Sequence, residues 1–218
     1  MDIYWGGQAL FKIKGKNASV IIDPYDGNFT GLKLPKDLTA DVVLSTHDHE
    51  DHSNVNVVAS PSGSKPMKFS EPGEYEVSGA VITGISAFHD DTNGSERGKD
   101  IIFHIMMDGL NTVHLGDLGQ SKLTEEQLTQ IGEVDILLIP VGSVYTIDGK
   151  QAAGIVSQLE PKIIIPMHYK IEGLKFDLEG VEGFLKEMGV ENVTPVPKLS
   201  ISKERLPEEP TVVLLSKT

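Results

Sequence analysis

The sequence predicts an α/β fold with strands in the interior and helices outside. From residue 113 to residue 168, strand-like apolar runs alternate with helix-like segments, which is the rhythm of β-α-β units. Residues 3–25 and 67–107 instead contain short alternating runs separated by turn residues, which is typical of paired β-strands. A length of 218 residues suits one domain with a sizeable core, so we expect a single domain over residues 1–218.

The N-terminal region is expected to form a hairpin followed by a buried strand. Residues 10–14 and 19–22 should pair, and the second of these runs leads to Asp23, which either braces a neighbouring loop or is a plain turn residue. Residues 26–40 are expected to be a polar loop. The apolar run 42–44 is then a buried strand that ends at Ser45 and Thr46.

The later elements are assigned from periodicity and from helix capping signals. Thr124 followed by Gln127 predicts a capping box at the start of a helix. After His52 there is room for only one or two helical turns before the Pro- and Gly-containing residues 60–66, so the approach to the preceding loop should be open or closed by a second subunit. Strands are expected at 75–77, 80–85, 101–107, 112–115, 135–140, 162–166, 199–201 and 211–215, and helices at 123–131, 151–159 and 181–188.

The composition excludes several classes of protein. There are no cysteines, so disulfides and thiolate ligands are excluded, and a reducing cytoplasm is the expected location. A net charge of -13 disfavours binding to nucleic acid. No apolar run approaches the roughly 20 residues of a membrane span, and the N-terminus does not have the pattern of a secretory signal.

Four potential metal ligands lie within six residues, directly after the strand at 42–44. They are His47, His49, Asp51 and His52, and three of the seven histidines in the chain are therefore in this stretch. Imidazole and carboxylate ligands suit Zn, Mn or Fe. The alternative is a polar surface loop, but such loops are usually rich in Lys and Glu. The alternating side chains of His47 and His49 could converge on one ion and leave Asp51 and His52 to face a second.

The pattern His47-x-His49-x-Asp51-His52 resembles the H-x-H-x-D-H signature of the metallo-β-lactamase superfamily. His89, Asp117 and His168 follow in the order of the remaining ligands of that superfamily. The chain is most similar to the branch that holds the ascorbate-phosphate lactonase and related Zn-dependent hydrolases, and the resemblance covers residues 3–185. It implies a four-layer αββα sandwich of two mixed β-sheets with helices outside.

The resemblance also implies a site and a reaction. His47, His49 and His89 would hold one divalent ion, Asp51, His52 and His168 a second, and Asp117 would bridge them. The ions are expected to be Zn, with Mn or Fe as alternatives. A bridging hydroxide would attack a lactone, an ester or a phospho(di)ester. The catalytic residues would be Asp51, Asp117 and His114, where His114 either supplies a proton, braces the site or packs passively.

Other residues bear on substrate and proton transfer. Many members of the branch carry a histidine where this chain has Gln8, which cannot carry a proton at neutral pH. The polar residues 90–100 form a mobile lid or a surface loop without a role, and Arg97 and Lys99 could meet a substrate anion. Tyr145 either lines the pocket or packs in the core, and His104 is expected to be structural.

The expected partner is a small-molecule substrate that could be anionic, and a homo-oligomer is plausible. Three alternatives remain open. A catalytically weak metal-binding module of the same fold would fit Gln8 and the short segment after His52. A redox di-iron protein would be expected to have an acid in place of His49. An RNA-processing nuclease would be expected to have a basic arm or an added domain.

Overall fold

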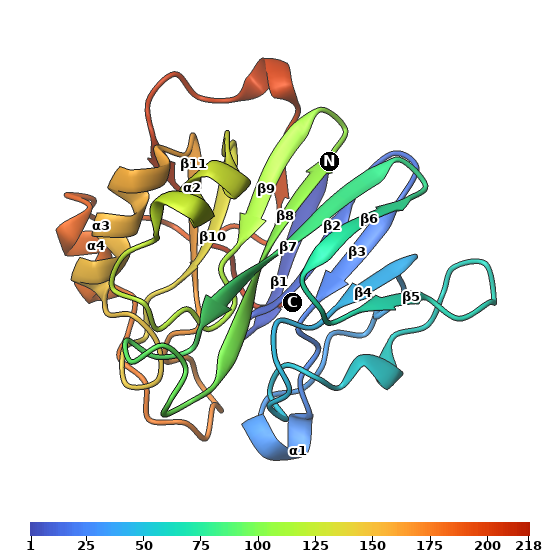
Figure 1. The fold of residues 1–218 in the computed structure, drawn as a ribbon, viewed down its shortest axis with the longest axis horizontal. Helices are drawn as coiled ribbons and strands as arrows, with labels where there is room; N and C mark the ends of the chain where they lie inside the picture. Colours follow the sequence, from blue (N-terminus) through green and yellow to red (C-terminus); the bar gives the residue numbers. More distant parts are fainter.

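Two mixed β-sheets pack face to face in the computed structural model, which describes residues Met1–Thr218 (Figure 1). The N-terminal sheet has the strand order β12-β1-β2-β3-β4-β5, and the C-terminal sheet has the order β13-β11-β10-β9-β8-β7-β6. The two short strands near the end of the chain therefore extend one edge of each sheet. The predicted fold class, an α/β sandwich of two mixed sheets, is confirmed.

The N-terminal sheet begins with an antiparallel meander and continues with parallel strands. β1, β2 and β3 pair antiparallel, whereas β3, β4 and β5 run parallel. Its strands are β1 (Asp2–Gly7), β2 (Leu10–Lys14), β3 (Ser19–Ile22), β4 (Val42–Leu44), β5 (Met67–Phe69) and β12 (Leu199–Ser200).

The C-terminal sheet is antiparallel from β6 to β9 and parallel from β9 through β10 and β11 to β13. The parallel part corresponds to the β-α-β rhythm of the sequence. Its strands are β6 (Gly73–Val77), β7 (Ala80–Phe88), β8 (Lys99–Met107), β9 (Leu110–His114), β10 (Ile136–Pro140), β11 (Ile163–Met167) and β13 (Thr211–Val212).

The helices lie mainly outside the C-terminal sheet (Figure 1). These are α2 (Glu125–Ile131), α3 (Gly149–Leu159) and α4 (Glu182–Glu187). The capping box predicted at Thr124 and Gln127 is present, and Asp148 and Gln151 form another at the start of α3. These caps satisfy backbone N–H groups at the helix starts that would otherwise lack partners.

The outer layer of the N-terminal sheet contains little helix. It has α1 (Gly27–Thr30) and a 3₁₀ turn, η1 (Val55–Val57). The turn η1 agrees with the short segment predicted after His52. The expectation of a polar loop over residues 26–40 is wrong at α1, because the carboxylate of Asp26 accepts a hydrogen bond from Asn28 N and caps one helical turn.

Most of the apolar core lies between the two sheets. A cluster of 47 buried residues includes Ile3 and Phe11 from one sheet and Phe103 and Ile139 from the other. A smaller cluster of nine lies on the other face of the N-terminal sheet, beneath the loops that replace a helical layer. No helix of the protein is both long and apolar enough to cross a membrane.

Candidate metal centre

Residues 45–54 form a tight loop at the carboxyl end of β4. The hydroxyl of Ser45 donates to the carbonyls of His47 and His52, at 2.9 and 3.2 Å, and the backbone N–H of His52 donates to His49 O. These bonds fold the loop back on itself, so that side chains close in sequence turn toward one point. Open α/β sheets place their sites at such strand ends.

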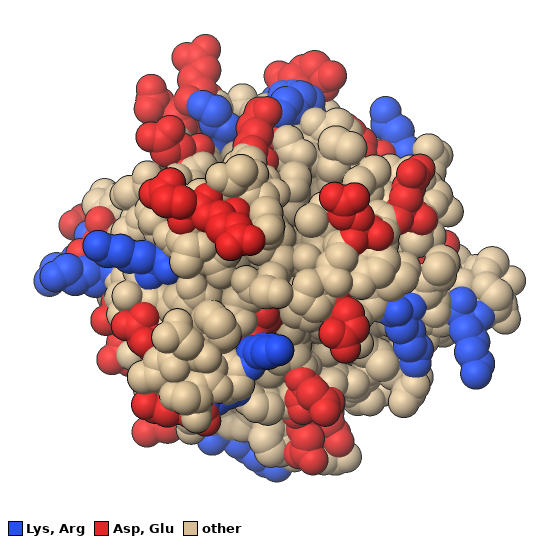
Figure 2. Space-filling model, in the orientation of Figure 1, with Lys and Arg blue, Asp and Glu red and all other residues tan.

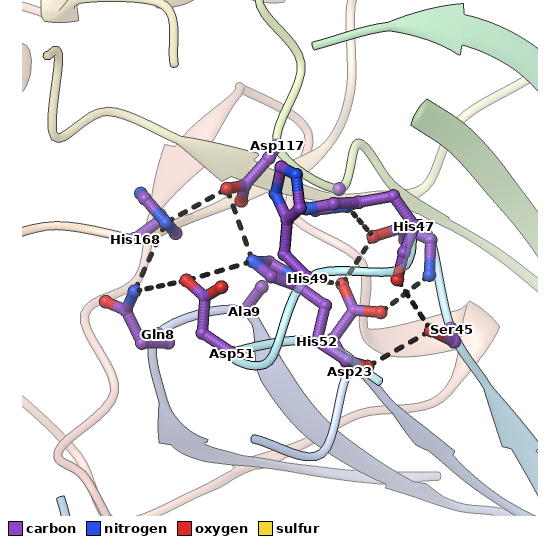
Figure 3. A network of polar contacts seen from close by, with 12 residues as sticks. Gln8, Ala9, Asp23, Ser45, His47, His49, Asp51, His52, Asp117 and His168 are labelled. Atoms are coloured by element: carbon purple, nitrogen blue, oxygen red, sulfur yellow. Dashed lines mark hydrogen bonds and ion pairs between the residues drawn. The ribbon is translucent and has the colours of Figure 1, made fainter. Parts of the chain in front are cut away.

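Asp23, at the end of β3, braces this loop. Its carboxylate accepts hydrogen bonds from the backbone N–H and the hydroxyl of Thr46, both at 2.8 Å, and lies 2.9 Å from His52 Nδ1 (Figure 3). A neutral His52 then donates from Nδ1 and leaves Nε2 free to act as a ligand. The bracing role considered for Asp23 is confirmed, and the plain turn residue is excluded.

Three further strands deliver the other candidate ligands. His89 follows β7, Asp117 follows β9 and His168 follows β11. Steric contacts explain why glycine stands at positions 116 and 119, on either side of Asp117. A Cβ at Gly116 would collide with the carboxylate of Asp100, and one at Gly119 would collide with the backbone of His89. The two glycines thus permit close packing of this segment against protein groups.

The seven candidate ligands lie together in two groups, within each of which the ligand atoms are at most 4.8 Å apart. The groups are His47, His49 and His89, and Asp51, His52, Asp117 and His168. Asp117 lies between them. Its Oδ2 is 3.2 Å from Nε2 of both His52 and His168 (Figure 3). The same oxygen is 3.4 Å from Nε2 of His89.

Unpaired buried atoms indicate that this cluster suits a cation. Nε2 of His47, Nε2 of His52 and Oδ1 of Asp117 are buried and have no hydrogen-bond partner. Buried polar atoms are normally satisfied, so such a concentration of unsatisfied atoms needs an explanation. The lone pair of a neutral imidazole such as His89 is repelled by the Asp117 carboxylate, 3.4 Å away, and a divalent ion between them would remove that repulsion.

The protonation states also suit metal binding. Burial lowers the pKa of His47 to about 4 and lowers the pKa of His49 and of His89, which keeps these imidazoles neutral at pH 7. Burial alone would raise the pKa of Asp51, but His52 lowers it to about 2. Burial alone would likewise raise the pKa of Asp117, but His168 and His52 lower it well below its ordinary value.

The pKa of His52 is shifted in the opposite direction to those of His47, His49 and His89. Burial alone would lower its pKa, but the carboxylates of Asp117, Asp51 and Asp23 raise it well above the ordinary value. Without a metal, His52 therefore keeps a proton that compensates the buried carboxylates. A cation at this position would displace that proton, so metal binding and proton release are coupled.

His114 is completely buried, and both of its ring nitrogens contact the backbone. Nε2 is 2.9 Å from Ala9 O, and Nδ1 is 3.0 Å from Gly116 N, which donates to it. His114 therefore ties the residue before Asp117 to the residue after Gln8. This geometry favours bracing over proton transfer, and it does not support the catalytic role predicted for His114. His104 contacts Asn111 at 3.1 Å on the strand pair β8–β9, which agrees with a structural role.

Gln8 occupies the position at which the family resemblance led us to expect a histidine. Its side chain is buried, and Nε2 is 3.4 Å from Asp51 Oδ2 and 3.2 Å from His168 Nε2 (Figure 3). Gln8 thus contacts two candidate ligands and can donate a hydrogen bond, but it cannot titrate.

Asp100 is a buried acidic residue that the sequence did not single out. Its Oδ1 is 3.4 Å from His47 Nδ1, and neither carboxylate oxygen has a hydrogen-bond partner. Burial, together with the charge of Asp117, raises the pKa of Asp100 well above its ordinary value. Asp100 lies at the start of β8, and only the pairing of β8 with β7 brings it to the site, so no local signal could have revealed it.

A pocket of about 610 Å³ opens above the cluster. Phe29, Tyr145 and Phe176 form an aromatic wall, with centroids 5.3 Å apart for Phe29 and Phe176 and 6.4 Å apart for Tyr145 and Phe176. Tyr145 therefore lines the pocket, and the core alternative is wrong. Phe29 and Phe176 were missed because they are distant in sequence and belong to otherwise polar segments.

Arg97 is the one Lys or Arg side chain that lines this pocket, and Lys99 does not line it. The guanidinium of Arg97 donates to Val144 O at 3.1 Å and lies 5.8 Å from the centre of the Tyr145 ring. The loop that carries Arg97 is organised by Asp90, whose carboxylate accepts four backbone N–H groups and the hydroxyl of Thr92. Residues 90–97 are thus a compact hydrogen-bonded loop at the pocket mouth.

Residues 2–168 match the family model described as the beta-lactamase superfamily domain. The chain belongs to the metallo-β-lactamase superfamily. Among curated relatives, a UPF0173 metal-dependent hydrolase of Thermococcus onnurineus is 31% identical over 184 residues, which cover 75% of this chain and 82% of that protein. A second such hydrolase, of Methanopyrus kandleri, is 28% identical over 217 residues, which cover 88% of this chain and 94% of that protein.

Solved structures agree with this assignment. A Thermotoga maritima protein assigned to the Zn-dependent hydrolases of the metallo-beta-lactamase superfamily is 36% identical, with a TM-score of 0.79 over 98% of this chain and 97% of the other. Igni18, a metallo hydrolase from Ignicoccus hospitalis, is similar in fold, with a TM-score of 0.67 and 20% identity. The match covers 92% of this chain and 99% of Igni18. The protein is thus one of the metal-dependent hydrolases of the metallo-β-lactamase superfamily.

Proposed function

We propose that this metallo-β-lactamase-fold hydrolase uses two divalent metal ions to cleave a lactone, an ester or a phospho(di)ester in a small molecule. The observation that carries the proposal is the position of Asp117, whose Oδ2 is within 3.4 Å of histidines from both ligand groups. One carboxylate placed between two groups of imidazoles is an arrangement that suits a pair of neighbouring cations.

In this proposal each of the two groups of candidate ligands would hold one ion, and Asp117 would be a ligand of both ions. Zn is the ion we propose first for this set of imidazoles and carboxylates, and Mn and Fe also suit these ligands. When bound, two such ions would lower the pKa of a nearby water, and their positive charge would stabilise an oxyanion. Asp23 and His114 hold His52 and Gly116 in position for this set.

The side chains around the ligands limit the proton chemistry. Gln8 can orient a group near Asp51 and His168 by a hydrogen bond, but it cannot transfer a proton. His114 has no free ring nitrogen. Neither residue serves as the general acid, so substrates whose leaving groups need no proton should react fastest.

The pocket favours a substrate with an apolar or planar part and at most a modest negative charge. The wall of Phe29, Tyr145 and Phe176 suits an apolar part. Arg97 could meet one anionic group, whereas the carboxylates of Asp48, Glu50 and Glu96 on the same rim disfavour several. A large nucleic acid is disfavoured for the same reason. The absence of cysteine supports a cytoplasmic location for this single-domain enzyme.

Metal content is the first test. Elemental analysis of the wild type should give about two ions per chain. His47→Ala should reduce that number, whereas His104→Ala should not, because His104 is a partly buried histidine outside the site. Less than half an ion per chain in protein prepared with Zn and Mn available would contradict the proposal.

Activity is the second test. The metal-loaded protein should hydrolyse members of a panel of lactones, aryl esters and phosphodiesters, and Asp117→Asn should abolish that hydrolysis. Two bound ions with no hydrolysis across the panel would favour the catalytically weak metal-binding module, which the non-titrating Gln8 would explain.

A further inference from the structure

A second cavity, of about 630 Å³, lies on the outer face of the N-terminal sheet. It shares no lining residue with the pocket above the metal centre. Ile3, Trp5, Phe11 and Ile13 of β1 and β2 point into the core between the sheets. Because side chains alternate along a strand, Tyr4, Lys12 and Lys14 of the same strands point the opposite way, into this cavity.

The cavity exists because the outer helical layer is missing here. One wall is formed by the loop 33–38, and another by Lys217 and Thr218 at the end of the chain. Gly6 keeps the floor open, since a Cβ there would collide with the side chain of Leu10. The loop is held down by Tyr25, whose hydroxyl oxygen lies 2.8 Å from Gly6 O and 2.9 Å from Lys33 O, so that these two carbonyls share its one proton.

The cavity is positively charged in a strongly acidic protein. The net charge of the chain is -13, and acidic side chains are spread over the face shown in Figure 2. Five lysines nevertheless line this one cavity, with Asp37 as its only acidic side chain. The lysines are Lys12, Lys14, Lys33, Lys36 and Lys217.

Most of this charge is not neutralised by the protein. Only Lys12 among the five forms an ion pair, with Asp37 at 2.6 Å. Asp2 is close to Tyr4 but is already paired with Lys198 at 2.8 Å. Lys217 is half-buried, its ammonium donates to the main-chain oxygens of Lys33 and Thr218, and burial lowers its pKa. Unpaired cations gathered in a concave site repel one another, and a bound anion would relieve that repulsion.

The cavity also has an apolar part. Leu10, Leu34, Pro35 and Leu38 line it beside the ring of Tyr4. Small-molecule sites of a few hundred Å³ commonly combine apolar walls with a few charged groups that fix orientation. An extended nucleic acid fits this site poorly, because the rest of the protein would repel it.

We propose that this lysine-lined cavity binds a small organic phosphate, with its phosphate among Lys33, Lys36 and Lys217 and its apolar or planar part against Leu10 and Leu34. The site is separate from the hydrolytic centre and does not depend on the function proposed for that centre.

Trp5 provides a reporter for binding. It is the only tryptophan of the chain and lies in β1 between two cavity residues, Tyr4 and Gly6. Its carbonyl accepts hydrogen bonds from the backbone N–H of Thr218, at 3.0 Å, and from the Thr218 hydroxyl, at 3.1 Å. An anion that reorders Lys217 and Thr218 should therefore change the fluorescence of Trp5.

The test titrates the metal-loaded protein with adenosine 5′-monophosphate and with inorganic pyrophosphate, followed by calorimetry and Trp5 fluorescence. Adenosine is the uncharged comparison. The variant Lys33→Gln/Lys36→Gln should bind both anions at least about tenfold more weakly, which corresponds to about 1.4 kcal/mol. The control Lys122→Gln/Lys150→Gln removes the same charge from exposed positions outside the cavity and should bind as the wild type does.

A further variant separates the two sites. Asp117→Asn alters the metal centre and should leave anion binding unchanged. Retained binding in Asp117→Asn together with loss in the lysine variant supports the proposal, and so does weakening by added salt. Binding that is absent, that is equal in the lysine variant, or that is lost in Asp117→Asn overturns it. A change in oligomeric state of the lysine variant without anion binding by the wild type also overturns it, because the cavity would then be a contact between protein copies.

Discussion

Asp23 Oδ2 lies 2.9 Å from His52 Nδ1, and the same carboxylate holds both the N–H and the hydroxyl of Thr46. One side chain at the end of β3 therefore fixes both the tautomer of His52 and the course of the ligand loop. Asp23→Ala should weaken metal affinity about 10- to 100-fold, the usual effect of removing a group that orients a metal ligand. Competition with a chromophoric chelator would measure it.

Asp26→Asn is a suitable control for this variant. Asp26 is three residues away and caps α1, and asparagine caps helices equally well, so metal affinity should not change. Equal affinities of Asp23→Ala and the wild type would show that the ligand loop holds its shape without the Asp23 carboxylate.

Gln8 contacts both Asp51 and His168 but cannot titrate. Gln8→His should introduce a proton carrier beside the proposed site. We expect kcat/KM to rise by up to about 10²-fold for esters with poor leaving groups, because such groups need a proton on departure. Esters with good leaving groups, such as p-nitrophenol, should show little gain.

The pH profile gives an independent measure of the same substitution. Gln8→His should add an ionisation to the profile of kcat/KM while metal content remains that of the wild type. Superimposable profiles for the two proteins would show that position 8 takes no part in proton transfer.

Asp90 organises the loop that positions Arg97. Its carboxylate accepts hydrogen bonds from the backbone N–H groups of residues 92, 94, 96 and 97, at 2.7–3.0 Å. Burial alone would raise the pKa of Asp90, but these bonds, led by that from Arg97 N–H, lower it, so the carboxylate is ionised at neutral pH. Asp90→Ala should remove the hydrogen-exchange protection of these amides and raise KM for anionic substrates.

Asp91→Ala is the matched control, because Asp91 contacts only Ser121 and lies on the exposed side of the loop. Metal content should be the same in both variants. If exchange in residues 92–97 were as slow in Asp90→Ala as in the wild type, other contacts would have to hold this loop.

The candidate metal cluster could be predicted from the sequence because its strongest signal is local. Four candidate ligands lie within six residues after an apolar strand, and the order of the remaining candidates follows the family pattern. The structure brings together all seven residues named from the sequence. The strands and larger helices were also predictable from periodicity, whereas α1 is a single turn that depends on one cap, Asp26.

The rest of the site could not be predicted, because it depends on contacts between distant segments. Asp100 reaches His47 only through the pairing of β7 with β8, and Phe29 meets Phe176 across almost 150 residues. The lysine-lined cavity arises because loops replace a helical layer, and Lys12, Lys33 and Lys217 are unremarkable when taken singly in the sequence.

Stability of the metal-free protein should fall as the pH is lowered from about 6.5 to about 4. Burial lowers the pKa of His47 to about 4, and lowers the pKa of His49, His89 and His114 from the value of 6.5. At these four histidines the unfolded chain binds more protons than the folded chain in this window, so protons favour unfolding, and the raised pKa of the single Asp100 opposes them only in part. His52 adds little slope there, because its raised pKa keeps it protonated in the folded state, and below pH 6.5 an unfolded histidine is largely protonated too.

The protonation of His47 alone should lower the free energy of unfolding by about 3 kcal/mol across this window. Urea unfolding of chelator-treated protein at about pH 7 and about pH 4 would measure the difference in the free energy of unfolding. His47→Gln removes one titrating group and should flatten the dependence. A variant with the full wild-type slope would show that His47 is not the group responsible.

Val144 adopts a left-handed backbone conformation, with φ of 57°, although it is β-branched and half-exposed. This conformation costs a β-branched residue of the order of 1 kcal/mol or more, whereas asparagine adopts it readily. Val144→Asn should therefore raise the free energy of unfolding by about 1 kcal/mol, which chemical denaturation would detect. Arg97 should retain its bond to the Val144 carbonyl, because the backbone does not change.

Val57→Asn is the matched control for Val144→Asn. Val57 is exposed to a similar extent but lies in the 3₁₀ turn η1 and has no positive φ. The same change of side chain there should not stabilise the protein. Equal effects at positions 57 and 144 would show that the left-handed conformation of Val144 stores no strain. A gain confined to position 144 would show that the left-handed conformation of Val144 lowers the stability of the protein.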